Sequence, residues 1–163
     1  MAGRGVHFAL TPEEEARLVD EPGGGDDHLI TVLAEIEERW DRDWLVETDK
    51  AWDAIHRCLT DGTLNYGHEP LEKCVLGTGF IYEGDDYIVN FLEANELKDV
   101  AAAIKDIDRE WMRAKYNAID PDDYGLPLSE EDFEYTWSNF VELRAFFQTA
   151  AENHRAVAFS VDQ

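Results

Sequence analysis

The stretch that decides the fold is Glu47–Gly62, which reads ETDKAWDAIHRCLTDG and has the periodicity of a short amphipathic helix. Thr48 or Asp49 can cap its start, because a side-chain oxygen there accepts a hydrogen bond from a free first-turn N–H group. Gly62 stands where a helix end favours a left-handed residue. The apolar residues at helical spacing, which predict one buried face, are Trp52, Ile55, Cys58 and Leu59.

The same helix carries a candidate ligand-binding edge made of Asp49, Trp52, Asp53 and His56. Steps of three and four residues join them, so they are neighbours on the helix surface. In the functional interpretation His56 is a proton shuttle or ligand contact, oriented by Asp53 or Asp49 and lined by Trp52. In the structural interpretation His56 only bonds a backbone carbonyl. The sequence favours the second, because no nucleophile or metal ligand accompanies the histidine–aspartate pair.

On the N-terminal side of this stretch we predict one strand and two helices. Gly3–Leu10 alternates apolar and other residues, which is typical of a strand. Thr11 caps a helix that has proline at its first position and is followed by two glutamates. That helix stops before the breaker cluster Glu21–Gly25. Asp27–Trp40 then keeps the helical period, capped by Asp26 or by its own first residue.

On the C-terminal side, Thr63–Pro70 is rich in turn formers and predicts irregular structure. Leu71–Leu76 fits a short helix or a strand, since periodicity does not separate the two at this length. Asp86–Leu92 predicts a strand buried on both faces. Two helical pieces follow over Glu93–Ile107 and Asp108–Asn117.

The last third predicts a long helix and a final strand. Ser129 and Asp132 form a capping box with aspartate in place of the usual glutamate, and apolar spacing then continues to His154. Arg155–Val161 alternates as a strand and is expected to pair with the opening strand. The predicted fold class is therefore α+β, with several helices packed on a small mixed or antiparallel sheet whose N- and C-terminal strands are paired.

Four segments together resemble the YfbM-like family, a domain of unknown function in bacteria. They are Glu47–Gly62, Val75–Val89 (VLGTGFIYEGDDYIV), Ile119–Trp137 (IDPDDYGLPLSEEDFEYTW) and Arg155–Gln163 (RAVAFSVDQ). The resemblance covers Val6–Gln163 and implies that residues 1–163 form a single domain of this family. It implies no activity.

The composition is strongly acidic, with 14 Lys and Arg against 37 Asp and Glu and a formal net charge of -23. Such a chain repels phosphate backbones and anionic lipids, so we expect neither a nucleic acid nor a membrane as partner. One interpretation of the charge is solubility or adaptation to salt. The other is an acidic surface that steers a basic protein partner.

The expected environment is the cytoplasm. No run of 18 apolar residues exists, and the N-terminus lacks the apolar core of a signal peptide. Cys58 and Cys74, the only cysteines, are expected to be reduced and partly buried. We expect a monomer or weak dimer.

Residues Asp120–Glu131 match the calcium-loop template at four positions. Tyr124 stands where a carboxylate or amide oxygen is needed, and Pro127 where a backbone N–H is needed. We therefore interpret the segment as a turn-rich connector that ends by capping the long helix.

Zinc would need four convergent nitrogen or sulfur ligands, and His56, Cys58, His68 and Cys74 have the right atoms. His56 and Cys58 point about 200° apart on a helix, because they are two residues apart. No metal site is predicted, and no cofactor, because Gly77-Thr78-Gly79 lacks the rest of a phosphate-binding fingerprint.

No catalytic set is complete, so the sequence favours a non-enzymatic acidic binding protein that neutralises or regulates a basic partner, as an immunity or inhibitor protein does. The alternative is a small-molecule-binding protein or enzyme with a pocket near His56 and Trp52.

Overall fold

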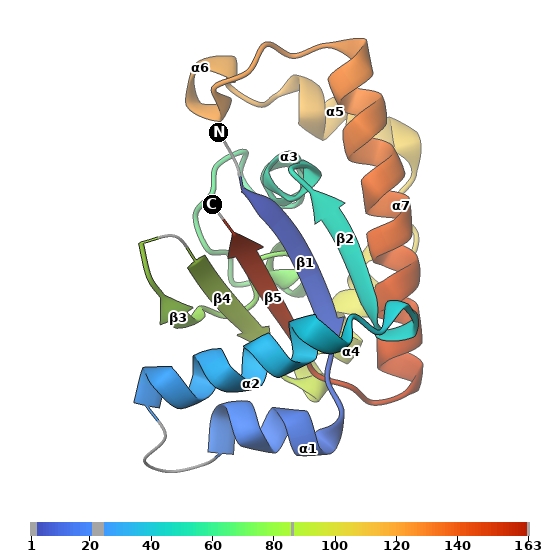
Figure 1. The fold of residues 1–163 in the computed structure, drawn as a ribbon. Helices are drawn as coiled ribbons and strands as arrows, with labels where there is room; N and C mark the ends of the chain where they lie inside the picture. The colour runs from blue at the N-terminus through green and yellow to red at the C-terminus, as the bar shows by residue number, and fades with distance from the viewer. Residues whose placement is uncertain (1–2, 21–24, 86, 163) are drawn as a thin grey trace.

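A five-stranded antiparallel sheet forms the centre of the computed structural model, which describes residues 3–20, 25–85 and 87–162 (Figure 1). Its strands are β1 (Arg4–Ala9), β2 (Leu45–Asp49), β3 (Phe80–Glu83), β4 (Tyr87–Leu92) and β5 (Val157–Asp162), in the spatial order β2-β1-β5-β4-β3. β1 and β5 pair antiparallel, from Arg4 opposite Asp162 to Ala9 opposite Val157. This confirms the predicted pairing of the terminal strands and the α+β class.

Helices lie on both faces of this sheet. The α-helices of the described residues are α1 (Pro12–Glu15), α2 (Gly25–Arg39), α3 (Ala51–Leu59), α4 (Ala94–Ile104), α5 (Arg109–Asn117), α6 (Pro121–Tyr124) and α7 (Glu130–Glu152). A π-helical turn, η1 (Ala16–Asp20), extends α1, and two 3₁₀ turns, η2 (Arg42–Trp44) and η3 (Pro70–Lys73), join other elements.

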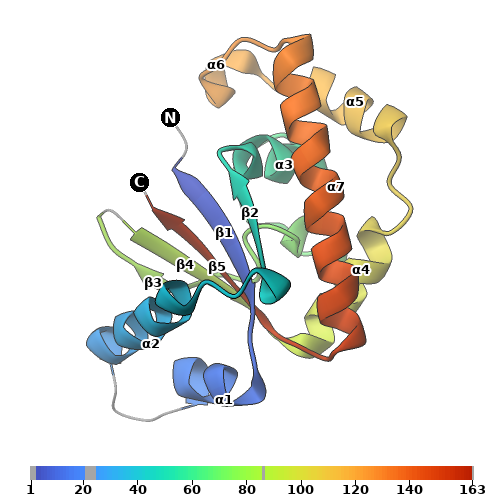
Figure 2. The same cartoon turned by 45° about the vertical axis from the view of Figure 1, so that its right-hand side comes forward.

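Two hydrophobic clusters result, one on each face, because successive strand residues point to opposite sides. In β1, Phe8 packs under α1 and α2, whereas Ala9 belongs to the cluster under α3, α4 and α7. Figure 2 shows α7 running along one side of the molecule with α3, α4 and α5 around it, and α1 with α2 on the other. The cluster that contains Ala9 also includes the large aromatic side chains Tyr116, Phe133, Phe140, Phe147 and Phe159.

The predicted helix starts at Thr11 and Ser129 are confirmed. Thr11 Oγ1 accepts a hydrogen bond from the Glu14 N–H at 3.1 Å, and Glu14 Oε1 accepts from the Thr11 N–H at 2.8 Å, which completes a capping box. Ser129 Oγ accepts from the Asp132 N–H at 3.0 Å. The Asp132 carboxylate does not return this bond, because the Ser129 N–H donates instead to the hydroxyl oxygen of Tyr116 at 3.2 Å.

The predicted helix over Glu47–Gly62 is wrong over residues 47–50. Leu45–Asp49 is β2, which pairs with β1, and α3 begins only at Ala51 with Lys50 at its cap position and no side-chain cap. Thr48 therefore caps nothing; it is buried in the strand and its hydroxyl donates to Gly5 O at 3.5 Å. Phe8 lies opposite Leu45, His7 opposite Val46 and Val6 opposite Glu47. This non-local pairing prevails over the helical period.

The other helix and strand boundaries differ less from the prediction. α2 begins at Gly25, so Asp26 and Asp27 lie within the helix and not at the position before it. The breaker residues 21–24 and the predicted first strand residue Asp86 lie outside the described residues. Strand β3 was not predicted, and the ambiguous Leu71–Leu76 segment contributes to η3 and a following turn. Among the described residues, no helix combines the length and the apolar character that crossing a lipid bilayer requires.

Candidate functional site

Helix α3 is buried along its whole length, whereas a typical amphipathic helix exposes its polar face to water. All nine of its residues are covered, charged ones included. The chain enters it through Asp49, whose positive φ of 45° turns the backbone sharply from β2 into the helix. Because α3 lies between the sheet, α5 and α7, its polar side chains must find partners within the protein.

Trp52 and His56, two of the predicted ligand contacts, are held by the protein itself. The indole N–H of Trp52 donates to Gly3 O at 2.8 Å, and its ring meets Phe159 edge-on. His56 is fully buried, and its Nε2–H donates to Asn65 O at 2.8 Å, while its Nδ1 has no partner among the described residues. Burial lowers the pKa of His56, so this imidazole is neutral at pH 7.

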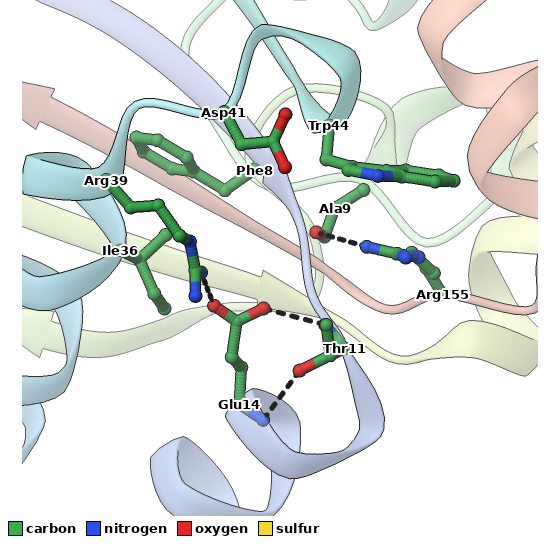
Figure 3. A pocket seen from close by; sticks show the side chains of 9 residues that line it. All are labelled: Phe8, Ala9, Thr11, Glu14, Ile36, Arg39, Asp41, Trp44 and Arg155. Atoms are coloured by element: carbon green, nitrogen blue, oxygen red, sulfur yellow. Dashed lines mark hydrogen bonds and ion pairs between the residues drawn. The ribbon is translucent and has the colours of Figure 1, made fainter.

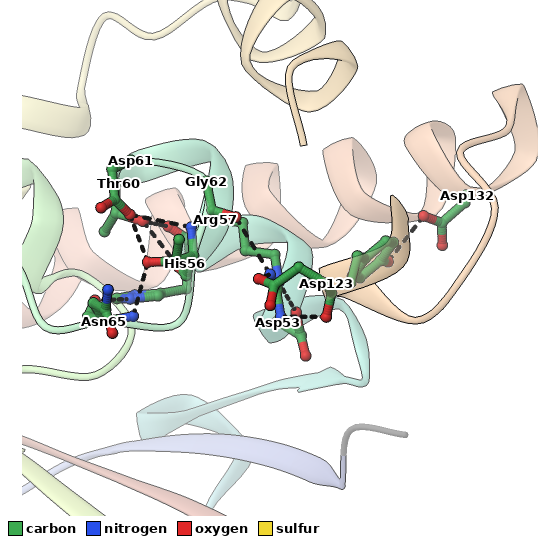
Figure 4. Close-up of polar contacts among 11 residues, drawn as sticks. Asp53, His56, Arg57, Thr60, Asp61, Gly62, Asn65, Asp123 and Asp132 are labelled. Atoms are coloured by element: carbon green, nitrogen blue, oxygen red, sulfur yellow. Dashed lines mark hydrogen bonds and ion pairs between the residues drawn. The ribbon is translucent and has the colours of Figure 1, made fainter. Parts of the chain in front are cut away.

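Asp53 belongs to an ion-pair cluster centred on Arg57, which Figure 4 draws. The Arg57 side chain is 4% exposed; its Nε donates to Asp53 Oδ1 at 2.7 Å and its Nη1 bonds the carboxylate of Asp123. Nη1 also donates to Gly62 O at 3.3 Å, and the guanidinium carbon lies 5.6 Å from the centre of the Tyr124 ring. Arg57 thus fastens the connector that contains α6 to helix α3.

A cavity of about 340 Å³ opens beside this cluster, between the start of α3, helix α6 and the first turns of α7. Asp49 supports its wall, because Tyr135 donates its hydroxyl proton to Asp49 Oδ2 at 2.7 Å. The same hydroxyl oxygen accepts the Lys50 N–H at 3.2 Å. The residues that line the cavity are Lys50, Asp53, Tyr124, Gly125, Leu126, Asp132 and Tyr135.

Asp132 fixes the polar side of this cavity. Its Oδ2 accepts hydrogen bonds from the hydroxyl groups of Tyr116 at 2.7 Å and Tyr124 at 2.9 Å. Burial, together with the bond to this carboxylate, raises the pKa of both tyrosines, so both remain donors at pH 7. Asp132 Oδ1 and Asp53 Oδ2 carry no hydrogen bond from any described residue and remain available as acceptors.

A second, wider hollow of about 650 Å³ lies on the other side of α6. It is lined by Arg57, Asp61, Gly62, Thr63, Leu64, Asn65, Ala118, Asp120 and Asp123. We call the linings of these two hollows together the α6 end. It contains five aspartates (Asp53, Asp61, Asp120, Asp123 and Asp132) and two basic residues (Lys50 and Arg57).

The connector Asp120–Glu131 forms helix ends rather than a calcium loop. Asp120 Oδ1 accepts the Asp122 N–H at 2.9 Å and so caps α6, and Gly125 ends α6 with a left-handed φ of 81°. Cys58 and Cys74 are unbridged and buried, and burial raises the pKa of the Cys58 thiol to about 12. Over residues 3–20, 25–85 and 87–162, no group of three or more His, Cys, Asp or Glu side chains is placed to hold a metal ion.

The structure places two of the four predicted ligand contacts at this cavity. Asp53 lines the cavity and Asp49 buttresses it, whereas Trp52 and His56 are buried beside it. Arg57 was not singled out, although an arginine four residues after Asp53 on an apolar helix is a signal for an internal ion pair. Tyr124 and Tyr135 carry no such signal, because only the folded chain brings them to the start of α3.

The molecule is thus an α+β domain in which helices cover both faces of an antiparallel sheet and a carboxylate-rich cavity lies at one end. A family model described as a domain of unknown function (DUF1877) matches residues 1–160, and the chain belongs to that family.

Among solved structures, the fold is shared by YfbM from Escherichia coli, described as a protein of unknown function. The match has a TM-score of 0.68 at 20% sequence identity and covers 97% of this chain and 99% of that one. At this identity the likeness concerns the fold alone. Among curated proteins, none matches this chain.

Proposed function

We propose that this protein binds a basic protein partner at the α6 end and acts by binding rather than by turnover. The observation that carries the proposal is the imbalance of charge around the two hollows, where five aspartates meet two basic residues. Asp53 and Asp123 already neutralise Arg57, and the exposed carboxylates Asp61 and Asp120 form no ion pair with a described residue. The net charge of -23 adds long-range attraction for a basic partner and faster encounter.

Apolar side chains beside these carboxylates support the same proposal. Leu126 in the cavity wall is 47% exposed and Leu64 in the outer hollow is 37% exposed, while Tyr124 stands in the wall of the cavity between them. A protein interface combines such apolar and aromatic anchors with a charged rim. Self-repulsion of the same net charge opposes association of two copies, in keeping with a monomer or weak dimer in the cytoplasm.

The test compares two double variants with the same change in charge. Asp61→Asn with Asp120→Asn removes two carboxylates from the α6 end, and Asp120→Asn keeps an oxygen for the α6 cap. Asp99→Asn with Asp106→Asn removes two exposed carboxylates that form no ion pair within the described part of the chain and lie at or just beyond α4. Native lysate is passed over each immobilised protein and over wild type at about 0.05 M and about 0.5 M salt.

We expect wild type and the α4 variant to retain the same basic proteins at low salt and to release them at high salt. The α6-end variant should retain distinctly less. Capture of no protein at either salt, of acidic proteins only, or of equal amounts by all three would contradict the proposal.

A second candidate function is the binding of a small molecule, and it is favoured by the cavity beside α3. Its volume of about 340 Å³ is within the usual range for ligand sites, and tyrosine rings and fixed carboxylates line it. A metabolite screen by thermal shift on wild type, Asp132→Asn and Tyr135→Phe tests this. A compound that stabilises wild type by several degrees and neither variant would favour it; a parallel screen of His56→Ala and Trp52→Ala tests the sequence-derived pocket.

A further inference from the structure

β1 runs into α1 at its end away from α6 (Figure 1), and a third hollow lies there. Its volume is about 170 Å³, which is room for a molecule of several heavy atoms. The segments that build it, which Figure 3 draws, are the end of β1, the start of α1 with its cap, the last turns of α2, η2 with its cap, and Arg155 in the segment before β5. Its lining residues are Phe8, Ala9, Thr11, Glu14, Ile36, Arg39, Asp41, Trp44 and Arg155.

The hollow already stabilises one carboxylate, that of Glu14. This side chain is buried, its Oε1 accepts the Thr11 N–H at 2.8 Å, and its Oε2 is paired with the guanidinium of Arg39. One of the two arginines in the wall is therefore neutralised within the protein. The pairing also demonstrates that a carboxylate and a guanidinium fit together in this space.

The other arginine, Arg155, has no such partner. Its guanidinium carbon lies 3.4 Å from the centre of the Trp44 ring, and its Nη1 makes one long hydrogen bond, 3.5 Å, to Ala9 O. It forms no ion pair with any described residue, although acidic residues outnumber basic ones 37 to 14. Asp41 shares the wall, but its Oδ1 accepts the Asp43 N–H at 3.1 Å and it is not paired with Arg155.

A guanidinium stacked flat on an indole keeps its N–H groups in its own plane, where they can donate to a carboxylate in bidentate fashion. A second donor stands on the same wall. Thr11 Oγ1 accepts a hydrogen bond from the Glu14 N–H, and its own hydroxyl proton is donated to no described residue. Arg155 and Thr11 thus offer unused donors to one small space.

We propose that this hollow binds a small organic carboxylate, held by Arg155 on the Trp44 platform and by the Thr11 hydroxyl group. The charges of the wall select this class, because Glu14 and Asp41 balance Arg39 and Arg155. A singly charged carboxylate adds one negative charge to a neutral wall, whereas a phosphate dianion adds two. The carboxylate comes from a free metabolite or from the C-terminus of a peptide, and both present the same group.

The experiment is an NMR titration of the ¹⁵N-labelled full chain, observing the Trp44 indole N–H and the Arg155 Nε–H. Trp44→Phe identifies the indole signal. The probes are acetate, N-acetylalanine as a mimic of a chain end, N-acetylalaninamide as its neutral counterpart, and inorganic phosphate. We expect saturable shifts of both signals with at least one carboxylate and none with the amide. Saturation by acetate indicates a free small carboxylate, and saturation by N-acetylalanine alone indicates a chain end.

Matched arginine variants test whether the carboxylate binds in this hollow. Arg155→Gln should weaken carboxylate binding at least about tenfold, because it removes a charge-assisted bidentate contact. Arg42→Gln changes an exposed arginine of the neighbouring η2 and should leave binding unchanged. Arg155→Lys keeps the charge without the planar fork and should bind at an intermediate strength, which also covers the case that Arg155→Gln does not fold. Absence of saturation with both carboxylates, equal shifts with the amide, tighter binding of phosphate, or unchanged binding by Arg155→Gln would overturn the proposal.

Discussion

Acid should destabilise this protein through His7, a strand β1 residue that is 1% exposed and stacked on Phe159. Neither ring nitrogen of His7 has a hydrogen-bond partner of good geometry among the described residues. Burial lowers the pKa of His7 from 6.5 to about 3, and the nearby backbone carbonyls of Cys74 and Val75 oppose this shift only in part. The folded protein therefore keeps His7 neutral under conditions in which the unfolded chain protonates it.

The direction in which stability changes with pH follows from proton uptake by the unfolded chain. The pKa of His7 is lower in the folded state, so its contribution to stability is complete above pH 6.5 and is lost as the pH falls toward 3. Between pH 7 and pH 5 the unfolded chain gains about 0.7 of a proton at this site and the folded chain gains almost none. The free energy of unfolding should fall by about 2 kcal/mol through His7 alone. The full loss, near pH 3, is about 5 kcal/mol.

The assay is urea unfolding at half-unit pH steps from 7 to 5, for wild type, His7→Phe and His68→Gln. His7→Phe places a ring of similar size in the same apolar setting, and it should lose about 2 kcal/mol less than wild type over this interval. Some pH dependence of the free energy of unfolding remains in His7→Phe, because burial also lowers the pKa of His56. His68 is exposed, so its variant should follow wild type. If wild type and His7→Phe lose stability equally, the reasoning from burial is refuted.

Three further changes should alter stability as measured by urea unfolding at pH 7. Arg57→Gln leaves the Asp53 carboxylate, whose side chain is 11% exposed, without its cation and should cost about 3 kcal/mol; a loss below about 1 kcal/mol would show that the ion pair matters little. Gly5→Ala places a methyl group 2.7 Å from Trp52 Cδ1 and should cost about 1–3 kcal/mol; a neutral result would mean that the indole moves freely. Ser129→Ala should cost about 1 kcal/mol through loss of the α7 cap, and Ser129→Asp should restore it; equal stability of the two variants would contradict the capping argument.

Local signals in the sequence were enough for the helix starts and the terminal strands. Thr11 and Ser129 act through bonds to residues three positions away, so their roles can be read without knowledge of the fold. The alternation in Gly3–Leu10 and in Arg155–Val161 is likewise local, and two such strands at the ends of an α+β chain pair readily.

The wrong secondary-structure predictions concern segments whose structure depends on a pairing partner distant in sequence. Leu45–Asp49 has no apolar period of its own, because its two apolar residues are adjacent, and its pairing with β1 makes it a strand. Phe80–Glu83 is a short edge strand of four residues, held by β4, with too few residues for a period to emerge.

The candidate site could be predicted only in part, for the same reason. Asp53 and Asp49 come from the helix start that the sequence marked, but the cavity beside them needs Tyr124 and Tyr135, which lie more than one element away. The complete burial of His56 also depends on the turn after α3, whose Asn65 carbonyl accepts its N–H.

The position of β5 between β1 and β4 has a consequence for how the chain folds. The neighbouring strands β1 and β5 come from opposite ends of the chain, with Arg4 opposite Asp162. The hydrogen-bond ladder between them therefore cannot form until both ends of the chain have been synthesised and have met. Such high contact order places this protein among the slower-folding domains of its size. Until the last strand arrives, β1 and β4 present unpaired edges, and the strong mutual repulsion of nascent acidic chains then protects them from joining one another.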